Sequence, residues 1–201
     1  MMKLIKKKQN QKENLFLKSS LGNIDIFFID KIIRTPNNVN IINNAKGLSF
    51  QSDLGALFLP IQDNLFIFYK KNKLLLSFDN VENKKSLLNL YIKLIRMKIR
   101  GVLQGFKLTL MLKGVGFKAF LEKNSIKLKL GYSHLISIPI PDNINVLNQT
   151  NSLIFHSMDY ISLTKYVHYI KTFKKPEPYK GKGLLLKNEK VLRKEGKKSK
   201  K

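Results

Sequence analysis

The stretch PNNVNIINNAKGLSFQS at residues 36–52 recurs as PDNINVLNQTNSLIFHS at residues 141–157, a constant offset of 105 positions. Seven of the 17 aligned positions are identical, and most of the others are conservative exchanges. Each copy reads as a proline turn, a short alternating strand, an asparagine-rich turn and a second strand. Because a unit of this size cannot bury its apolar face alone, two copies predict two similar small domains. The alternative is a chance resemblance between two hairpins of similarly biased composition.

The residues around the two hairpins predict the elements that complete each domain. Period-two alternation between turn residues predicts further strands at 56–59, 65–69, 74–78, 106–113, 115–122 and 125–131. Apolar residues at helical spacing predict one helix over 84–103 and another that begins after Asp159 and runs through Lys171. The predicted fold class is α+β, with two similar small domains, each an antiparallel sheet packed by one helix.

Basic extended segments are predicted at both ends of the chain, which sets the expected domain boundaries. Residues 1–18 hold six lysines against one glutamate, and residues 174–201 hold 11 lysines and one arginine against three glutamates. The expected division is therefore a basic N-terminal extension, an N-terminal α+β domain ending in the long helix, a C-terminal α+β domain and a basic tail. Their bounds are 1–18, 19–104, 105–173 and 174–201.

The overall charge points to a polyanionic partner. The chain has 201 residues and a formal charge of +25, from 38 basic and 13 acidic side chains. Such self-repulsion favours a bound nucleic acid or an anionic membrane surface. All but four of the basic residues are lysines, which act as point charges toward phosphate and lack the planar fork that reads guanine. Contact with a nucleic-acid backbone is thus favoured over base readout.

Several other functional classes find little support in the residues. Cysteine is absent, and the three histidines are nowhere spaced i, i+4, so no metal site and no cofactor is expected. The most apolar stretch, residues 87–103, is interrupted by four basic residues and is not expected to span a membrane. Only 13 acids are present and none lies beside a histidine in the sequence, which disfavours an RNA-modifying enzyme.

The glycine motif KGVGFKA at residues 113–119 has the spacing of a dinucleotide fingerprint but the wrong context. A true fingerprint opens a helix and is followed by an acidic residue about 20 positions later. Here the chain runs into a turn and another strand. We interpret the motif as a hairpin turn whose glycines allow positive φ or close backbone approach.

The tail begins with PEPYKGKG at residues 176–183, which is more structured than a solubilising tail requires. Its prolines fix two φ angles, its tyrosine can stack on a base or sugar, and its glycines let lysines and backbone amides approach phosphates. These features predict docking on structured nucleic acid. The alternative is a solvated lysine tail that makes only weak, unspecific contacts.

These motifs resemble the universal large-subunit ribosomal protein six family, the bacterial-type L-six. The resemblance covers most of residues 84–198, through GVLQGF, KGVGFKA, LGYSH, PEPYKGKG and RKEGKK. It implies a fold of two duplicated α+β domains and a structural role with no catalytic activity. One departure concerns Leu185 and Leu186, which stand where the family has a basic-aromatic pair.

The resemblance also implies the partners and the contact residues. The expected partners are large-subunit ribosomal RNA, near the sarcin-ricin loop and the stalk base, and neighbouring large-subunit proteins, with no small-molecule substrate and no membrane. By position, the expected RNA contacts are Ser133, His134, Lys174, Lys175, Tyr179, Lys180, Gly181, Lys182, Arg193, Lys194, Lys197 and Lys198.

The bias toward Lys, Asn, Ile and Phe is typical of an AT-rich genome and suggests an organelle. A mitochondrial ribosome is the first expectation, and a plastid-type organelle is the second. The alternative function is a peripheral protein of anionic membranes, whose lysines would meet lipid through the 84–103 helix, or a general RNA-binding protein outside the ribosome.

Overall fold

The computed structural model describes residues 31–44, 46–62, 64–70, 72–78 and 84–196. The expected N-terminal extension, residues 1–18, lies outside these ranges. The chain divides into two compact units. Of the described residues, unit 1 holds those from 31 to 50 and from 58 to 96, and unit 2 holds those from 51 to 57 and from 97 to 196. The predicted α+β class with two similar sheet domains is confirmed, while the predicted boundary after residue 104 stays a prediction.

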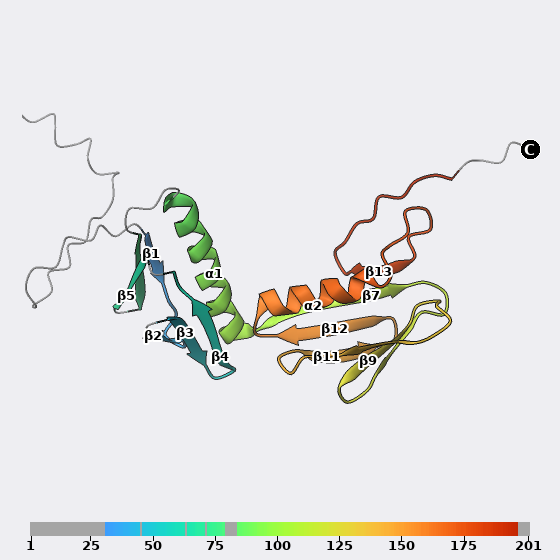
Figure 1. The fold of residues 1–201 in the computed structure, drawn as a ribbon, viewed down its shortest axis with the longest axis horizontal. Helices are drawn as coiled ribbons and strands as arrows, with labels where there is room; N and C mark the ends of the chain where they lie inside the picture. The colour runs from blue at the N-terminus through green and yellow to red at the C-terminus, as the bar shows by residue number, and fades with distance from the viewer. Residues whose placement is uncertain (1–30, 45, 63, 71, 79–83, 197–201) are drawn as a thin grey trace, which may run out of the picture. The chain divides into compact units, whose positions relative to one another are not determined.

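In the first half of the chain, the described residues form six strands in two sheets, followed by a helix (Figure 1). The strand order is β1-β6-β5 in one sheet and β2-β3-β4 in the other. The bounds are β1 Lys31–Arg34, β2 Asn40–Asn44, β3 Gly47–Ser52, β4 Gly55–Pro60, β5 Leu65–Lys70, β6 Lys73–Phe78 and α1 Lys84–Gln104. In unit 1 the rings of Phe78 and Tyr91 lie 5.8 Å apart, which packs β6 against α1.

The second half repeats this plan with one additional strand. The strand order is β10-β9-β8 in one sheet and β11-β12-β7-β13 in the other. The bounds are β7 Phe106–Lys113, β8 Lys118–Leu121, β9 Ser125–Lys129, β10 Ile136–Pro139, β11 Asn145–Gln149, β12 Ser152–Ser157, α2 Tyr160–Thr172 and β13 Gly183–Leu186. The predicted helices and their starting positions agree with α1 and α2.

The sequence repeat corresponds to a structural repeat that is larger than the hairpin. Strands β1, β2 and β3 begin 105 positions before β10, β11 and β12, respectively. Both proline turns close in the same way, with Val39 N–H donating to Pro36 O and Ile144 N–H donating to Pro141 O. The sheets also match, since β1-β6-β5 corresponds to β10-β9-β8 and β2-β3-β4 to β11-β12-β7. The order along the chain differs, because β1, β2 and β3 come first in the first half, whereas their counterparts β10, β11 and β12 follow β7, β8 and β9 in the second half.

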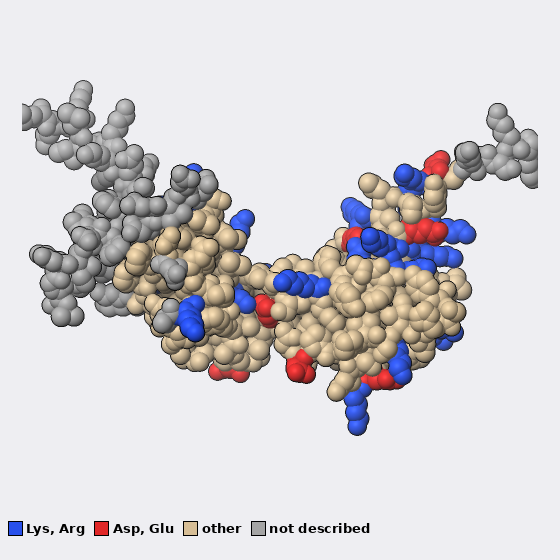
Figure 2. Space-filling view, viewed as in Figure 1, with Lys and Arg blue, Asp and Glu red and all other residues tan. Residues whose placement is uncertain are grey.

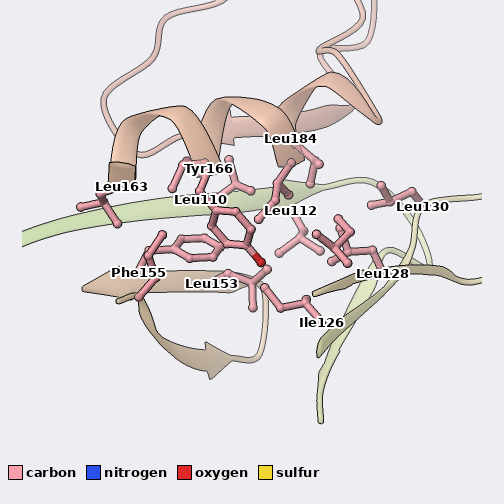
Figure 3. Close-up of a cluster of buried hydrophobic side chains, with 14 residues drawn as sticks. Leu110, Leu112, Ile126, Leu128, Leu130, Leu153, Phe155, Leu163, Tyr166 and Leu184 are labelled. Carbon is pink, nitrogen blue, oxygen red and sulfur yellow. The ribbon is translucent and has the colours of Figure 1, made fainter. Parts of the chain in front are cut away.

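The core of unit 2 lies between α2 and the sheet that contains β7 and β12 (Figure 3). Leu110, Leu153 and Phe155 face the helix from the sheet, and Leu163 and Tyr166 face them from α2. The Phe155 and Tyr166 rings meet edge to face, with centroids 5.9 Å apart. Each apolar side chain buried here contributes roughly 1.5–3 kcal/mol. The helical spacing and strand alternation read from the sequence therefore meet in one cluster.

The polar end of Tyr166 is accommodated by a hydrogen bond to the second sheet. Its hydroxyl donates to the backbone carbonyl of Pro139, the last residue of β10, at 2.9 Å. Burial, with a smaller effect from Tyr169, raises the pKa of Tyr166 to about 12. The hydroxyl therefore stays protonated and continues to donate across the physiological range.

The start of α2 is fixed by a partly buried ion pair. Asp159 is the N-cap residue, as the sequence predicted, and its carboxylate accepts hydrogen bonds from Lys98 Nζ at 2.9 Å and Ser162 Oγ at 2.7 Å. Burial alone would raise the pKa of Asp159, but the hydrogen bonds from Lys98 and Ser162 and the charge of Lys98 outweigh it and hold the pKa below its ordinary value. Asp159 is thus ionised where α2 begins.

Strand β13 was not predicted, because the whole tail was interpreted as a basic segment facing RNA. Residues 183–186 instead pair antiparallel with β7, with Leu184 opposite Leu112 and Leu185 opposite Met111. Leu184 and Leu185 are buried. The leucine pair that departs from the family's basic-aromatic pattern includes Leu185, which belongs to the core.

We expect Leu184→Ala to lower the free energy of unfolding by about 2–5 kcal/mol, since it removes a fully buried side chain from the sheet. Urea denaturation followed by circular dichroism measures this. The matched control is Leu192→Ala, at a tail position that is 92% exposed, where the change should stay within about 0.5 kcal/mol. Equal effects of the two substitutions would show that β13 does not stabilise unit 2.

Candidate nucleic-acid interface

The tail loop, residues 174–183, links the end of α2 to β13 and is closed by backbone hydrogen bonds. Glu177 N–H donates to Lys182 O at 2.8 Å, and Gly181 N–H donates to Glu177 O at 2.9 Å. At its base, Leu184 N–H donates to Lys174 O at 2.9 Å. The loop is therefore held in one shape by the chain itself, in addition to the restriction that its prolines impose.

Gly183 is required by close packing at the base of the loop. Its φ is +146°, and a Cβ placed on it would lie 2.7 Å from Pro176 Cα and 2.8 Å from Lys175 O. Both neighbours are backbone atoms that cannot rotate away. The sequence predicted that this glycine lets the backbone approach a phosphate, whereas the structure shows that it allows the loop to close.

The expected contact residues of the loop are mostly exposed. Lys175, Lys180 and Lys182 are exposed, and Tyr179 is 55% exposed. Lys174 is half-buried at the root of the loop. Gly181 is buried, and its amide is the donor to Glu177 described above. The loop thus presents one aromatic ring and three ammonium groups from a backbone of fixed shape.

The segment that follows β13 returns to the tail loop. Lys194 N–H donates to Pro178 O at 2.9 Å. A Cβ placed on Gly181 would lie 3.2 Å from Arg193 Nε, so the Arg193 side chain covers that glycine. The structure therefore brings Arg193 and Lys194 together with the loop, although about ten residues of chain separate them. Lys197 and Lys198 lie outside the described residues.

The predicted contacts Ser133 and His134 lie in a turn beside the root of the tail loop. Both are exposed. Their neighbour Tyr132 donates its hydroxyl to Phe173 O at 2.8 Å, and Lys174 Nζ lies 4.6 Å from the centre of the Tyr132 ring. Tyr132 thus joins the turn to the tail loop through a hydrogen bond and a cation–π contact. Sequence reasoning missed this residue, although it stands inside the LGYSH motif.

A second attachment holds the segment after β13 against α2. Lys171, in the last turn of α2, forms an ion pair with Glu189, and the Glu189 carboxylate also accepts Leu186 N–H at 3.1 Å. The hydrogen bond from Lys171, helped by that from Leu186, lowers the pKa of Glu189 despite its partial burial. One of the tail's few acids therefore has a structural partner within the protein.

The charge of the described part of the tail is strongly positive. Residues 174–196 hold eight basic and three acidic side chains. Figure 2 shows lysine and arginine side chains gathering around the tail, with carboxylates among them. Within the ranges that the structure describes, no cluster of metal-ligating side chains occurs and no helix is long and apolar enough to cross a membrane.

Comparisons with known proteins show which family the chain belongs to. The family model Ribosomal protein L6 matches residues 113–185. The large ribosomal subunit protein uL6c of Trieres chinensis is 38% identical over 171 residues, which are 84% of this chain and 96% of that protein. The chain belongs to the ribosomal protein L6 family. The uL6 protein of Mycoplasmoides gallisepticum is 35% identical over 84% of this chain and 94% of its own length, and that of Karelsulcia muelleri is 35% identical over 90% and 100%.

Membership of the L6 family confirms the resemblance drawn from the motifs. The matched range of the family model includes the 131–134 turn and the tail loop. Arg193 and Lys194 lie beyond that range, and the structure joins them to it through the hydrogen bond to Pro178. The interface residues taken together still form a predicted site.

We expect the ion pair between Lys171 and Glu189 to stabilise the protein at neutral pH and to lose this effect at acidic pH. The pKa of Glu189 is lower in the folded chain than its ordinary 4.5, so its stabilisation is complete above that value and is lost as the pH falls through the folded pKa. Lys171→Met should therefore destabilise the protein at neutral pH, and the difference from wild type should shrink toward pH 3. Urea unfolding at several pH values measures this, with Lys187→Met as the control at an exposed lysine. A difference that did not change with pH would contradict it.

Proposed function

We propose that this L6-family protein is a structural constituent of the large ribosomal subunit, and that it binds large-subunit ribosomal RNA through unit 2 and the tail. The named relatives are proteins of the large ribosomal subunit. We place the contact near the sarcin-ricin loop and the stalk base, as the family resemblance implies. The observation that supports RNA binding best is a closed loop that presents Tyr179, Lys180 and Lys182 from a backbone of fixed shape.

The proposed mechanism is electrostatic and shape-based clamping of folded RNA. The lysine ammonium groups bind phosphates as point charges, and Arg193 offers a guanidinium that can bind a phosphate with two parallel hydrogen bonds. Tyr179 stacks on an unpaired base or a sugar. Because internal hydrogen bonds already fix the loop, little conformational entropy is lost on docking. Ser133 and His134 add polar contacts from the neighbouring turn.

Ribosomal protein L6 family members are components of the ribosome rather than enzymes, and this chain is not an enzyme. Its partners in the proposal are the RNA of the large subunit and the proteins that lie alongside. The C-terminal domain, residues 105–173, and the tail, residues 174–201, are the proposed RNA-binding parts of the chain.

We further propose that the ribosome in question belongs to an organelle. The composition bias supports an AT-rich organelle genome, and a mitochondrial ribosome is the first proposal. The uL6c relatives support a plastid-type ribosome as the alternative. Purifying mitochondria and plastids from the source cells and probing the large subunits of each with an antibody against the chain separates the two.

Replacing both Lys180 and Lys182 by Gln should weaken binding to large-subunit RNA and make it less dependent on salt. Two lost phosphate contacts should lower the slope of log affinity against log salt by about 1.4–1.8. Filter binding at several salt concentrations measures both quantities. Lys123→Gln combined with Lys165→Gln removes the same charge from exposed positions elsewhere in unit 2. If that control lowered the slope as much, bulk charge rather than the tail loop would bind the RNA.

Tyr179→Leu should weaken RNA binding by about 1–3 kcal/mol if the ring stacks on a base. Tyr179→Phe should keep most of the affinity, because the flat ring remains. The side chain is largely exposed, so neither change should alter the free energy of unfolding by more than about 0.5 kcal/mol. An affinity that fell equally in both variants would assign the contribution to the hydroxyl group rather than to stacking.

A further inference from the structure

Val115 is a β-branched apolar residue that the fold leaves 91% exposed. It lies between Gly114 and Gly116 in the KGVGFKA motif, which the tail interface does not include. A single exposed apolar side chain is ordinary on a protein surface. This one differs because its turn is fixed in shape, is flanked by lysines and lies beside the tail loop.

The turn that presents Val115 is tight. Phe117 N–H donates to Gly114 O at 3.3 Å, and Gly116 has a φ of +77°. This combination fits a type II turn, with Val115 at its second position and glycine at the third, where positive φ is required. A Cβ placed on Gly116 would meet nothing within 4 Å, so the glycine leaves the backbone open to an approaching partner.

Phe117 anchors the turn to the body of unit 2. A Cβ placed on Gly114 would lie 2.8 Å from the Phe117 ring, and one on Gly131 would lie 3.5 Å from it. The ring also packs against the hydrophobic core. Val115 is therefore held away from the core by a turn whose base is fixed, and the exposure is not that of a loose loop end.

The Val115 turn lies at the same end of unit 2 as the tail loop. Lys113, at the end of β7, is paired with Gly183, the last residue of the tail loop. Through Phe117 the turn also adjoins Gly131, which precedes Tyr132 and the predicted contacts Ser133 and His134. In Figure 1 the Val115 turn, the 131–134 turn and the tail loop lie at the same end of the sheet that contains β7.

The charges around Val115 favour a polyanion over an apolar protein partner. Lys113 and Lys118 flank the turn and are both exposed. No acidic residue occurs between positions 113 and 121, and Glu122, which follows β8, forms an ion pair with Lys127 at 2.6 Å. An exposed valine between two lysines suits a partner whose phosphates bind the lysines and whose sugars offer an apolar surface to the valine.

We propose that the Val115 turn is a second RNA contact, in which Val115 packs against riboses in the minor groove of an RNA duplex while Lys113 and Lys118 bind the flanking phosphates. The minor groove of A-form RNA is wide and shallow and displays its sugars, so a protruding turn can enter it. Gly116, which has open space where a side chain would stand, allows the backbone to approach the 2′-hydroxyls. This inference rests on the proposed function and adds a duplex contact to the tail loop.

The test is filter binding of the full-length protein to transcribed large-subunit RNA over a range of salt concentrations. Val115→Ser should weaken binding by about tenfold, as expected for the loss of one buried valine side chain, and should leave the salt slope unchanged. Lys113→Gln combined with Lys118→Gln should lower the slope by about 1.4–1.8. Leu147→Ser is the matched control, because Leu147 is an apolar residue of unit 2 that is 56% exposed on β11, and it should bind as wild type.

A tethered probe gives the position of the contact. The chain has no cysteine, so the thiol of Val115→Cys is a single attachment point for a tethered iron chelate that generates hydroxyl radicals. The tail loop still holds the RNA in this variant. Cuts on both strands across one minor groove are expected from position 115 and not from Leu147→Cys. Cuts confined to unpaired RNA would overturn the proposal.

The other outcomes separate this proposal from the proposed function. If wild type binds and the tail-loop lysine variant is weakened while Val115→Ser binds as wild type, the second contact is wrong and the tail contact stands. If Val115→Ser keeps its RNA affinity but is poorly incorporated into large subunits, Val115 contacts a protein and the proposal is wrong. A wild-type chain that did not bind the RNA would overturn both.

Discussion

The antiparallel pairing of β13 with β7 is the constraint on which the candidate interface depends. It places Gly183 opposite Lys113 and buries Leu184 and Leu185. The tail loop is thereby tied at one end to α2 and at the other to the sheet, so ten residues must close within a short span. Internal hydrogen bonds then close this loop, and Lys175, Tyr179, Lys180 and Lys182 are left exposed.

The same pairing explains why three separate segments form one surface. β7 ends at Lys113, where the Val115 turn begins, and Phe117 links that turn to Gly131. Tyr132 then joins the next turn to Phe173 and Lys174. Each link is a short contact between residues far apart in sequence. The surface is positive because lysines lie in the tail loop and on both sides of the Val115 turn, and its shape is fixed because each segment is attached to the core of unit 2.

The duplicated plan of the two halves shows that the candidate interface is built on a scaffold that occurs twice in the chain. Both halves contain sheets of matching strand order, and in the described residues a helix follows β6 in the first half and β12 in the second. In the described residues, the four-stranded sheet belongs to the second half, where β13 occupies the free edge of β7. An edge strand offers unpaired amides and carbonyls, and a chain segment that satisfies them gains both hydrogen bonds and burial. The scaffold is therefore shared, and the tail makes unit 2 different.

The sequence by itself determined the repeat, the positions of most strands, both helices, the basic character of the tail and the resemblance to the L6 family. These features are local, because alternation, helical spacing and turn residues act over a few positions. Only the tertiary structure showed that the tail contains β13, that Gly183 serves loop closure, that Tyr132 links the turn to the loop and that Val115 is presented beside them. Those facts depend on contacts across tens of residues. A four-residue leucine strand inside a basic tail has no local signal that distinguishes an edge strand from an exposed linker.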